Sequence, residues 1–410
     1  MAVVRPFRAL RPDPTFAEEV ACVPYDVVSS AEARALASGR THSFLHVIRP
    51  EVGLPVGVDE HAEAVYRAGA DALDRMTRAG TLVEDDAPGL FAYRLTWRGA
   101  SQTGLYGLVS VDEYDAGRIV RHERTRPDKE DDRTRHLLAQ RAHAEPVMLA
   151  YADDAALAQH LLAATAAEPL YDLVADDGSG EPVRHTLWRI PDAEAVAAAF
   201  EAVPRLYIAD GHHRCKAASR AYHDLAAEGQ ATPADEAAFF PAALFPMGEM
   251  RILPYHRLVA EMPDGGRDAF LAALRERFDV VVNAPAEPET AGDVSVYAGG
   301  GTWLGLRLPE TAGTGAADRL DVARLGEHVL EPLFGIADAR TDPRLAFVGG
   351  IRGPEALEAA VDEGRAAVAF AMHPTPIEGL VAVSDAGELM PPKSTWFEPK
   401  LRSGLLIHRF

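Results

Sequence analysis

The hydrophobic positions along the chain switch between helical and extended spacing, which predicts a mixture of helices and strands. Residues 59–80 have helical spacing, and Gly69 lies on their apolar face, where it either weakens the helix or marks a close helix contact. Ser29 before AEARALAS indicates a capped helix. Residues 42–48 (HSFLHVI) are apolar and partly alternate, so they predict a strand.

Extended patterns dominate the next part of the chain. Residues 91–99 and 104–114 predict a hairpin with its turn near Gly99. The clearest signal comes later, where the strand pattern of residues 204–209 runs through a short glycine loop into a helical pattern at 214–228. This succession of strand, loop and helix directs backbone N–H groups toward an anion.

The pattern changes again near residues 262–268, at a Pro-Asp-Gly-Gly sequence. Because 410 residues exceed what one hydrophobic core usually organises, we expect two domains, at 1–262 and 263–410. The second contains a helix followed by strands, then helical patterns at 319–334 and 354–364. The predicted class is α/β with mixed sheets, and an α+β arrangement is the alternative.

Composition and charge narrow the classes of function. The net charge of −21 disfavours generic nucleic-acid binding, while a pocket with a few local donors can still bind one phosphorylated metabolite. With two cysteines and no signal-peptide pattern or long apolar run, we expect a cytoplasmic protein without a membrane segment. The HExxH and zinc-finger spacings are missing from the sequence, which leaves any metal unassigned.

The loop at 210–214 (DGHHR) contains the strongest candidate chemistry. Gly211 permits close backbone approach, and His212 and His213 lie at the predicted helix start, where the dipole favours an anion. Arg214 offers a planar donor fork for phosphate, and Asp210 can hold a metal or orient a histidine. The alternative is a capped helix start with two incidental histidines.

Two further segments carry charge that suits the same site. The run at 121–135 (RHERTRPDKEDDRTR) includes His122, Glu123, Lys129 and Arg133. The alternative is a solvated loop, which is the usual explanation of such a charged run. Residues 393–404 (KSTWFEPKLRSG) combine cations with hydroxyl groups. The alternative for them is an exposed loop before a final strand, LLIHRF.

The cations of the second segment are Lys393, Lys400 and Arg402. Tyr25, Asp26 and His256 are weaker candidates, which either contact a substrate or simply end strands.

Several ordered strings along the chain resemble the bacterial and archaeal family of domain-of-unknown-function number 1015. They are VPYDVVS, RHERT, YIADGHHRCKAA, LPYHRLV, RTDPRLAFVGG and KSTWFEPKLRSGL. Together they run from residue 23 to 405, so the resemblance covers nearly the whole chain.

The DGHHR loop is also similar to the phosphate-binding loop of the ParB and sulfiredoxin superfamily. Sulfiredoxins have a Gly-Cys-His-Arg loop at a helix start, and free-serine kinases of that superfamily have an Asp-Gly-x-His-Arg loop with a carboxylate base. This resemblance implies a nucleotide-dependent kinase acting on free serine or a similar hydroxylated metabolite, with ATP or ADP and Mg²⁺ as cofactors.

In that kinase, residues 211–214 would hold the donor phosphates and Glu123 would be the base. Lys129, Arg133 and Lys400 would steady the transferring group. Two alternatives stay open: a phosphatase or other hydrolase with His212 or His213 as acid–base, and a non-enzymatic nucleotide-binding regulator of the ParB type. The expected partner is a small-molecule substrate, and a homodimer is left open.

Overall fold

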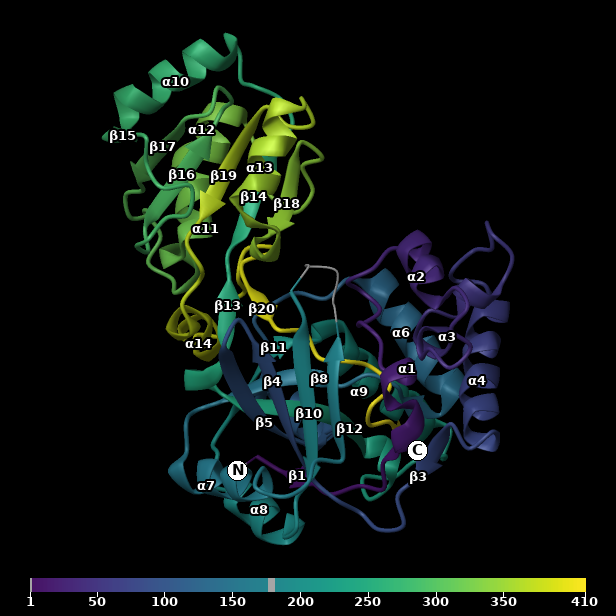
Figure 1. Ribbon diagram of the computed structural model, residues 1–410. Helices are drawn as coiled ribbons and strands as arrows, with labels where there is room; N and C mark the ends of the chain where they lie inside the picture. Colours follow the sequence, from purple (N-terminus) through teal and green to yellow (C-terminus); the bar gives the residue numbers. More distant parts are fainter. Residues whose placement is uncertain (1, 176–180) are drawn as a thin grey trace. The chain divides into compact units, whose positions relative to one another are not determined.

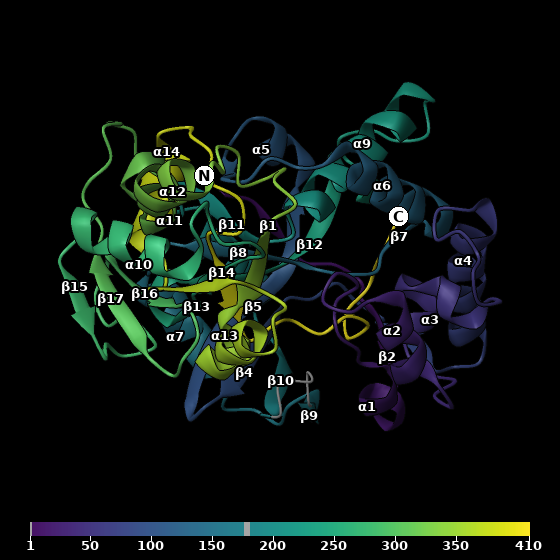
Figure 2. The same cartoon turned by 90° about the horizontal axis from the view of Figure 1, so that it is seen from above.

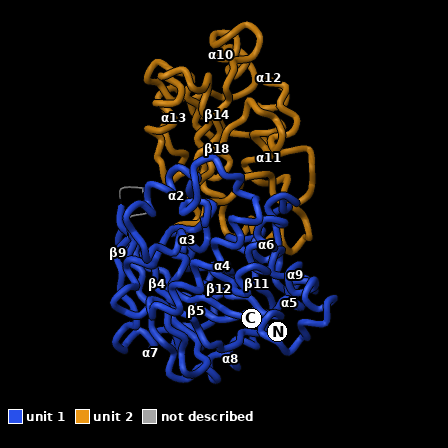
Figure 3. Tube along the Cα trace, turned by 90° about the vertical axis from the view of Figure 1, so that its right-hand side faces the viewer, with its two compact units in different colours: residues 1–250, 399–410 blue, residues 251–398 orange. Residues whose placement is uncertain are grey.

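The computed structural model describes residues 2–175 and 181–410, and these form two compact units (Figure 3). The first comprises Met1–Met250 with Pro399–Phe410, and the second comprises Arg251–Glu398. These units differ from the predicted division at residue 262. The strands just after Met250 pair within the second unit, and the last residues of the sequence return to the first.

A mixed sheet forms the centre of the first unit (Figure 1). Its strands are β1 (Val4–Arg5), β4 (Phe91–Trp97), β5 (Ala100–Ser110), β6 (Ile119–Val120), β8 (Val147–Tyr151), β9 (Tyr171–Ala175), β10 (Val183–Arg189), β11 (Leu206–Asp210) and β12 (Phe239–Pro246). Their order is β6-β11-β8-β12-β5-β4-β10-β9, and β1 pairs with β5. Within the sheet, β11 is parallel to β6 and β12 is parallel to β8, whereas the other pairs are antiparallel.

Two short strand pairs and a set of helices complete this unit. The pairs are β2 (Leu10–Pro12) with β3 (Leu82–Glu84), and β7 (Ala142–His143) with β21 (His408–Arg409). The helices are α1 (Ala17–Val20), α2 (Ser30–Ala37), α3 (Leu45–Ile48), α4 (Glu63–Arg78), α5 (Val111–Asp115), α6 (Pro127–Gln140), α7 (Ala155–Ala164), α8 (Ala193–Phe200) and α9 (His212–Ala227). Helices α9, α6 and α4 lie side by side (Figure 2).

The two faces of this sheet pack against different segments, because successive residues of a strand point to opposite faces. On one face, Ala92 of β4 joins Leu105 and Val109 of β5 in the main core with residues of α7, α8 and α9. On the other face, Tyr93 accepts a hydrogen bond from the Arg402 amide at 3.2 Å, and Tyr106 donates to the Leu406 carbonyl at 2.8 Å. These contacts anchor the segment that contains Lys400.

The second unit contains an antiparallel sheet and a separate two-stranded ribbon. The sheet strands are β14 (Tyr255–Val259), β15 (Val280–Val282), β16 (Asp293–Tyr297), β17 (Trp303–Arg307), β18 (Leu345–Gly349) and β19 (Val368–Met372), in the order β15-β17-β16-β19-β14-β18. The ribbon pairs β13 (Arg251–Leu253) with β20 (Trp396–Glu398). The helices are α10 (Gly266–Arg277), α11 (Asp321–Leu325), α12 (Glu331–Phe334), α13 (Gly353–Asp362) and α14 (Ile377–Asp385), and a π-turn at Gly326–Leu330 joins α11 to α12.

The predicted α/β class with mixed sheets is confirmed, and so are several local predictions. Ser29 caps α2 in a capping box with Glu32, and β4 and β5 form the expected hairpin. A Cβ on Gly69 would lie 2.8 Å from the side chains of Gln140 and Pro50, so this glycine permits a close contact.

Three local predictions need correction. Residues 42–48 form no strand, because Leu45, Val47 and Ile48 are buried on the short helix α3. The charged run is not a solvated loop throughout, since α6 begins within it at Pro127. Of LLIHRF, His408–Arg409 forms the short strand β21, and Ile407 pairs with Leu10 as an isolated bridge.

Candidate functional site

Gly211 joins β11 to α9, so the predicted strand, glycine loop and helix are confirmed. Its φ of +103° lies in the region that glycine adopts without strain, and a Cβ there would lie 3.0 Å from a methyl carbon of Val147 on β8. The first amides of a helix have no carbonyl partner within it and carry the positive end of its dipole. The loop therefore offers these amides at a tightly packed point of the sheet.

Asp210, the last residue of β11, shares one carboxylate oxygen between two cations. Arg214 Nη2 lies 3.2 Å from Oδ2, and Lys400 Nζ lies 3.6 Å from it. Burial raises the pKa of Asp210, but the charges of Lys400 and Arg214 outweigh this effect and hold that pKa below its usual range. The Asp210 side chain is 27% exposed, so this ionised group remains accessible to a ligand.

His212 and His213 occupy the first two positions of α9, and each accepts a backbone amide. The His122 N–H donates to His212 Nε2 at 3.4 Å, and the Arg126 N–H donates to His213 Nε2 at 3.1 Å. These bonds assign the ring proton to Nδ1 in both histidines. These two bonds therefore hold the start of the charged run against the loop.

Burial keeps this group of histidines neutral. The rings of His122 and His212 pack edge to face with centroids 4.4 Å apart. Burial lowers the pKa of His122 to about 4, and burial together with the neighbouring His122 lowers that of His212 well below its usual value. Glu123 Oε2 lies 3.8 Å from His212 Nδ1, and its side chain is 44% exposed. A carboxylate thus reaches solvent beside the loop.

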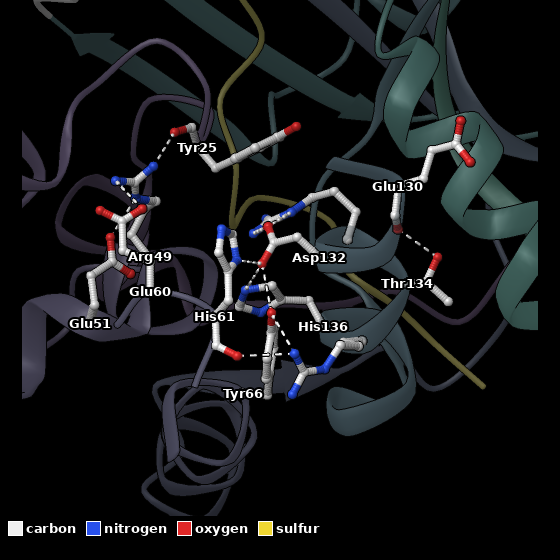
Figure 4. Close-up of polar contacts among 12 residues, drawn as sticks. Tyr25, Arg49, Glu51, Glu60, His61, Tyr66, Glu130, Asp132, Thr134 and His136 are labelled. Atoms are coloured by element: carbon white, nitrogen blue, oxygen red, sulfur yellow. Dashed lines mark hydrogen bonds and ion pairs between the residues drawn. The ribbon is translucent and has the colours of Figure 1, made fainter. Parts of the chain in front are cut away.

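A second ionic cluster surrounds Asp132 on α6 (Figure 4). Arg133 binds one carboxylate oxygen through Nε and Nη2, at 3.0 and 2.7 Å. The Tyr66 hydroxyl and His61 Nδ1 lie 2.9 and 3.1 Å from the other oxygen, and His136 Nε2 lies 3.9 Å from it. Burial raises the pKa of Asp132, but the charge of Arg133 outweighs it and lowers that pKa.

Glu145, which follows β7, contacts three separate parts of the chain. Its Oε1 accepts hydrogen bonds from the Tyr25 amide and the Ser403 hydroxyl, both at 3.1 Å. Arg133 Nη1 lies 3.7 Å from its Oε2, and Arg133 Cζ lies 4.0 Å from the centre of the Tyr25 ring. Burial raises the pKa of Glu145, while Arg214 and Arg133 oppose that shift.

A cavity of about 40 Å³ lies among α6, α9 and the chain after β7. This volume has room for about three water molecules. Its polar lining consists of Arg133, His136, Gln140, His143, Glu145 and Arg214. Arg214 and Arg133 thus belong both to their own ionic clusters and to one shared cavity.

The structure brings many of the predicted residues together in the first unit. His122 and Glu123 contact His212, and Lys400 lies beside Asp210. Arg402 is buried, and its backbone amide donates to the Tyr93 hydroxyl of the sheet.

Two further candidates, in the part of the chain that the structure describes, form no hydrogen bond or ion pair with the loop. Lys129 is half-buried in the first turn of α6. Asp26 is exposed beside Tyr25, and its charge acts on His213 and Arg214 of the loop.

Two predicted residues belong to the second unit. His256 is fully buried on β14, where its Nδ1 accepts the Met372 amide at 3.1 Å. Lys393 Nζ lies 5.5 Å above the Tyr255 ring. Their participation in the site stays a prediction.

Three residues of these clusters were not predicted from the sequence: Glu145, His61 and His136. Glu145 stands in an ordinary Ala-Glu-Pro sequence, which carries no local signal of a buried carboxylate. His136 follows Asp132 by four residues, and this helical spacing would have placed the two side chains together. His61 reaches the cluster only through tertiary packing of α4 against α6.

A family model described as "Protein of unknown function (DUF1015)" matches residues 4–323. The chain belongs to this family. The DUF1015 match includes the charged run and the loop, while Lys400 and Arg402 follow the matched range. None of the curated proteins matches the chain.

Three solved structures illustrate more distant similarity. A conserved hypothetical protein from Pyrococcus furiosus is 14% identical with a TM-score of 0.32, and the alignment covers 73% of this chain and 95% of that one. SbnI from Staphylococcus aureus, with a C-terminal truncation, is 15% identical with a TM-score of 0.37, covering 74% and 87%. A free serine kinase in complex with AMP is 13% identical with a TM-score of 0.34, covering 73% and 92%.

Across residues 2–175 and 181–410, no three His, Cys, Asp or Glu side chains gather as a metal site. Within the same residues, no helix combines the length and the apolar character needed to cross a bilayer.

Proposed function

We propose that this DUF1015 protein is a nucleotide-dependent phosphotransferase that acts on a small hydroxylated metabolite, with free L-serine as the first candidate. The observation that carries the proposal is the Asp210 carboxylate, which two cations share at the N-terminus of α9. Helix amides, a guanidinium and an ammonium are the donors that a chain of phosphates requires. They occur together although the net charge is −21.

Asp210 also fits the role of a magnesium ligand. Mg²⁺ in phosphotransfer sites is usually held by one or two carboxylates together with substrate phosphates, and Asp210 is ionised and accessible. When bound, Mg²⁺ would neutralise phosphate charge, with ATP as donor and ADP as product. Arg214 and Lys400 would then turn from Asp210 toward the phosphate oxygens.

Glu123 is the proposed base. Its carboxylate would take the proton of the acceptor hydroxyl as the oxygen forms a bond to the γ-phosphorus and the bridging oxygen leaves with ADP. The half-exposed side chain beside His212 suits this role, because a base must reach a bound substrate. Phosphoryl transfer depends mainly on position and charge, and the loop supplies both.

The alternatives receive less support. In the hydrolase, His212 or His213 would exchange protons, but both Nε2 atoms accept backbone amides and both rings have lowered pKa values. A DNA-binding regulator of the ParB type is disfavoured by the acidic composition.

The test is incubation of the pure protein with ATP, Mg²⁺ and a panel of hydroxy amino acids, followed by phosphorus NMR. We expect ADP and a phosphomonoester in equal amounts, with Glu123→Gln strongly reducing both. Lys216→Ala, a change at a half-buried residue of α9 that does not line the cavity, is the control. Release of inorganic phosphate from phosphoserine without nucleotide would favour the hydrolase, and unchanged turnover in Glu123→Gln would remove the base from the proposal.

A further inference from the structure

Each charged group that lines the cavity between α6 and α9 has an opposite charge beside it. Arg133 is paired with Asp132, while Arg214 and Lys400 share Asp210, and Glu145 adds one more carboxylate. The charged groups of the lining itself are Arg133, Arg214 and Glu145. The carboxylate of Asp26 also acts on Arg214 and on Glu145.

This balance limits what the cavity can bind. A lone anion or cation would add an uncompensated charge to a largely buried region, which costs free energy. A zwitterion adds no net charge, and its two ends can face opposite charges. Guanidinium groups and the Glu145 carboxylate both line the space, so both ends of a zwitterion find a partner.

The lining also contains an unsatisfied polar atom. His136 lines the cavity, and its Nδ1 has no hydrogen-bond partner among the described residues although the side chain is 7% exposed. Buried polar atoms without a protein partner usually bond to a ligand or to ordered water. A ligand atom that approached Nδ1 from the cavity would satisfy this nitrogen.

Arg214 connects the cavity to the loop. It lines the cavity and pairs with Asp210, and a Cβ on Gly211 would lie only 3.2 Å from its guanidinium carbon. A molecule in the cavity therefore lies against the same side chain that faces the proposed phosphate site.

We propose that this cavity binds the α-ammonium and α-carboxylate groups of a small amino acid, which is the acceptor of the phosphoryl group. Arg133 and His136 would donate to the carboxylate, Glu145 would accept from the ammonium, and the side-chain hydroxyl would point along Arg214 toward the loop. The volume of about 40 Å³ suits such a head group and excludes a bulky one. This assignment rests on the proposed function, although its binding step is measurable without nucleotide.

The first test is calorimetric titration of the nucleotide-free protein with L-serine, L-threonine, glycine, ethanolamine and L-glycerate. Ethanolamine lacks the carboxylate, and L-glycerate lacks the ammonium. We expect at least one amino acid to bind and both truncated compounds to bind at least about tenfold more weakly, because each loses a charge-assisted hydrogen bond. Equal binding of a truncated compound, or no binding of any amino acid, would overturn the assignment.

The second test uses variants of the lining. Glu145→Gln keeps the shape and removes the charge, His136→Gln keeps a polar group, and Ala217→Val fills space beside the cavity. We expect each to raise the KM for the amino acid about tenfold or more with little change in the KM for ATP, whereas Lys216→Ala changes neither. Circular dichroism of each variant distinguishes a loss of binding from a loss of folding. Of the three substitutions, we expect His136→Gln to disturb the fold least.

The two proposals fail differently. Amino-acid binding without phosphorylation would retain the cavity assignment and reject the kinase. Phosphorylation of a hydroxyl compound with KM values unaffected by all three lining variants would retain the kinase and reject the cavity assignment.

Discussion

Of the aspartate–arginine pairs in the first unit, those of Asp132 and Asp210 differ in how completely each aspartate is bonded. Asp132 and Arg133 are neighbours on α6, with two contacts of 3.0 and 2.7 Å, and the other carboxylate oxygen accepts from Tyr66. Asp210 is held at 3.2 and 3.6 Å by Arg214 and Lys400, which come from different elements.

This difference separates a structural role from a functional one. A carboxylate that is saturated by short bonds has no capacity left for a ligand, and breaking its pair leaves a buried charge uncompensated. A carboxylate with longer, shared and partly exposed contacts can exchange its partners for phosphate and metal. We therefore expect Asp132 to determine stability and Asp210 to determine turnover.

The largest effect expected is that of Asp132→Asn on stability. Removing one partner of a buried ion pair costs about 3–5 kcal/mol, so the free energy of unfolding should fall by that amount. Urea denaturation followed by circular dichroism measures it. Asp131→Asn is the matched control, because Asp131 is an exposed neighbour paired with Arg220, and it should change stability by less than about 1 kcal/mol. Equal losses of unfolding free energy in the two variants would show that Asp132 contributes no more to stability than the exposed Asp131.

Asp210→Asn should instead reduce turnover, by about 10²–10³-fold, since it removes the carboxylate proposed to hold Mg²⁺. Its loss of stability should be smaller than that of Asp132→Asn, because Asp210 is more exposed. Single-turnover phosphorylation and urea denaturation on the same preparations compare the two quantities. Normal turnover together with a large loss of stability would make Asp210 a structural residue as well.

Acid should weaken both regions through their buried histidines. Folding lowers the pKa of His136 and of His212, so the unfolded chain binds protons below about pH 6.5 that the folded chain excludes. The stabilising contribution is thus complete above pH 6.5 and is lost as the pH falls toward the folded pKa values. Each histidine should add a slope of about 1.4 kcal/mol per pH unit.

Chemical denaturation between pH 7 and 5 tests this expectation. His136→Gln and His212→Gln should each reduce the slope of the unfolding free energy against pH by about 1.4 kcal/mol per pH unit, which corresponds to one proton. A slope that neither variant changes would assign the acid sensitivity to other groups.

The smallest effect expected is that of Lys400→Ala on nucleotide affinity. Lys400 is 17% exposed and at the longer distance from Asp210, so we expect about fivefold weaker binding of ADP, about 1 kcal/mol. The difference from the wild type should shrink as salt screens the charge. Equal affinities of Lys400→Ala and the control Lys216→Ala would leave Lys400 with a structural role.

The loop was predictable from sequence because its signals are local. A buried strand, a glycine and an amphipathic helix follow one another directly, and each has its own residue pattern. The helix start at Pro127 also had a local signal, since proline in the first turn with acidic Asp128 and Glu130 is typical of a helix N-terminus. The many charged residues on both sides of Pro127 favoured the interpretation as a solvated loop instead.

Tertiary contacts were not predictable in the same way. Glu145 becomes important only because Tyr25, Arg133 and Ser403 converge on it from separate segments. The short apolar run at residues 42–48 fits a strand or a helix equally well. It forms the helix α3 because of its packing in the folded protein, which the local sequence does not reveal. The contact between Lys400 and Asp210 was expected from charge, but its geometry depends on the return of the chain to the first unit.

That return has a consequence for biosynthesis. Lys400 leaves the ribosome after all of Arg251–Glu398, so the first unit lacks this cation and the segment bonded to Tyr93 and Tyr106 until the inserted second unit has been translated. A chain released early would retain the glycine loop while Asp210 lacked one of its two cations. Completion of the proposed phosphate site is thereby tied to completion of translation through the inserted unit.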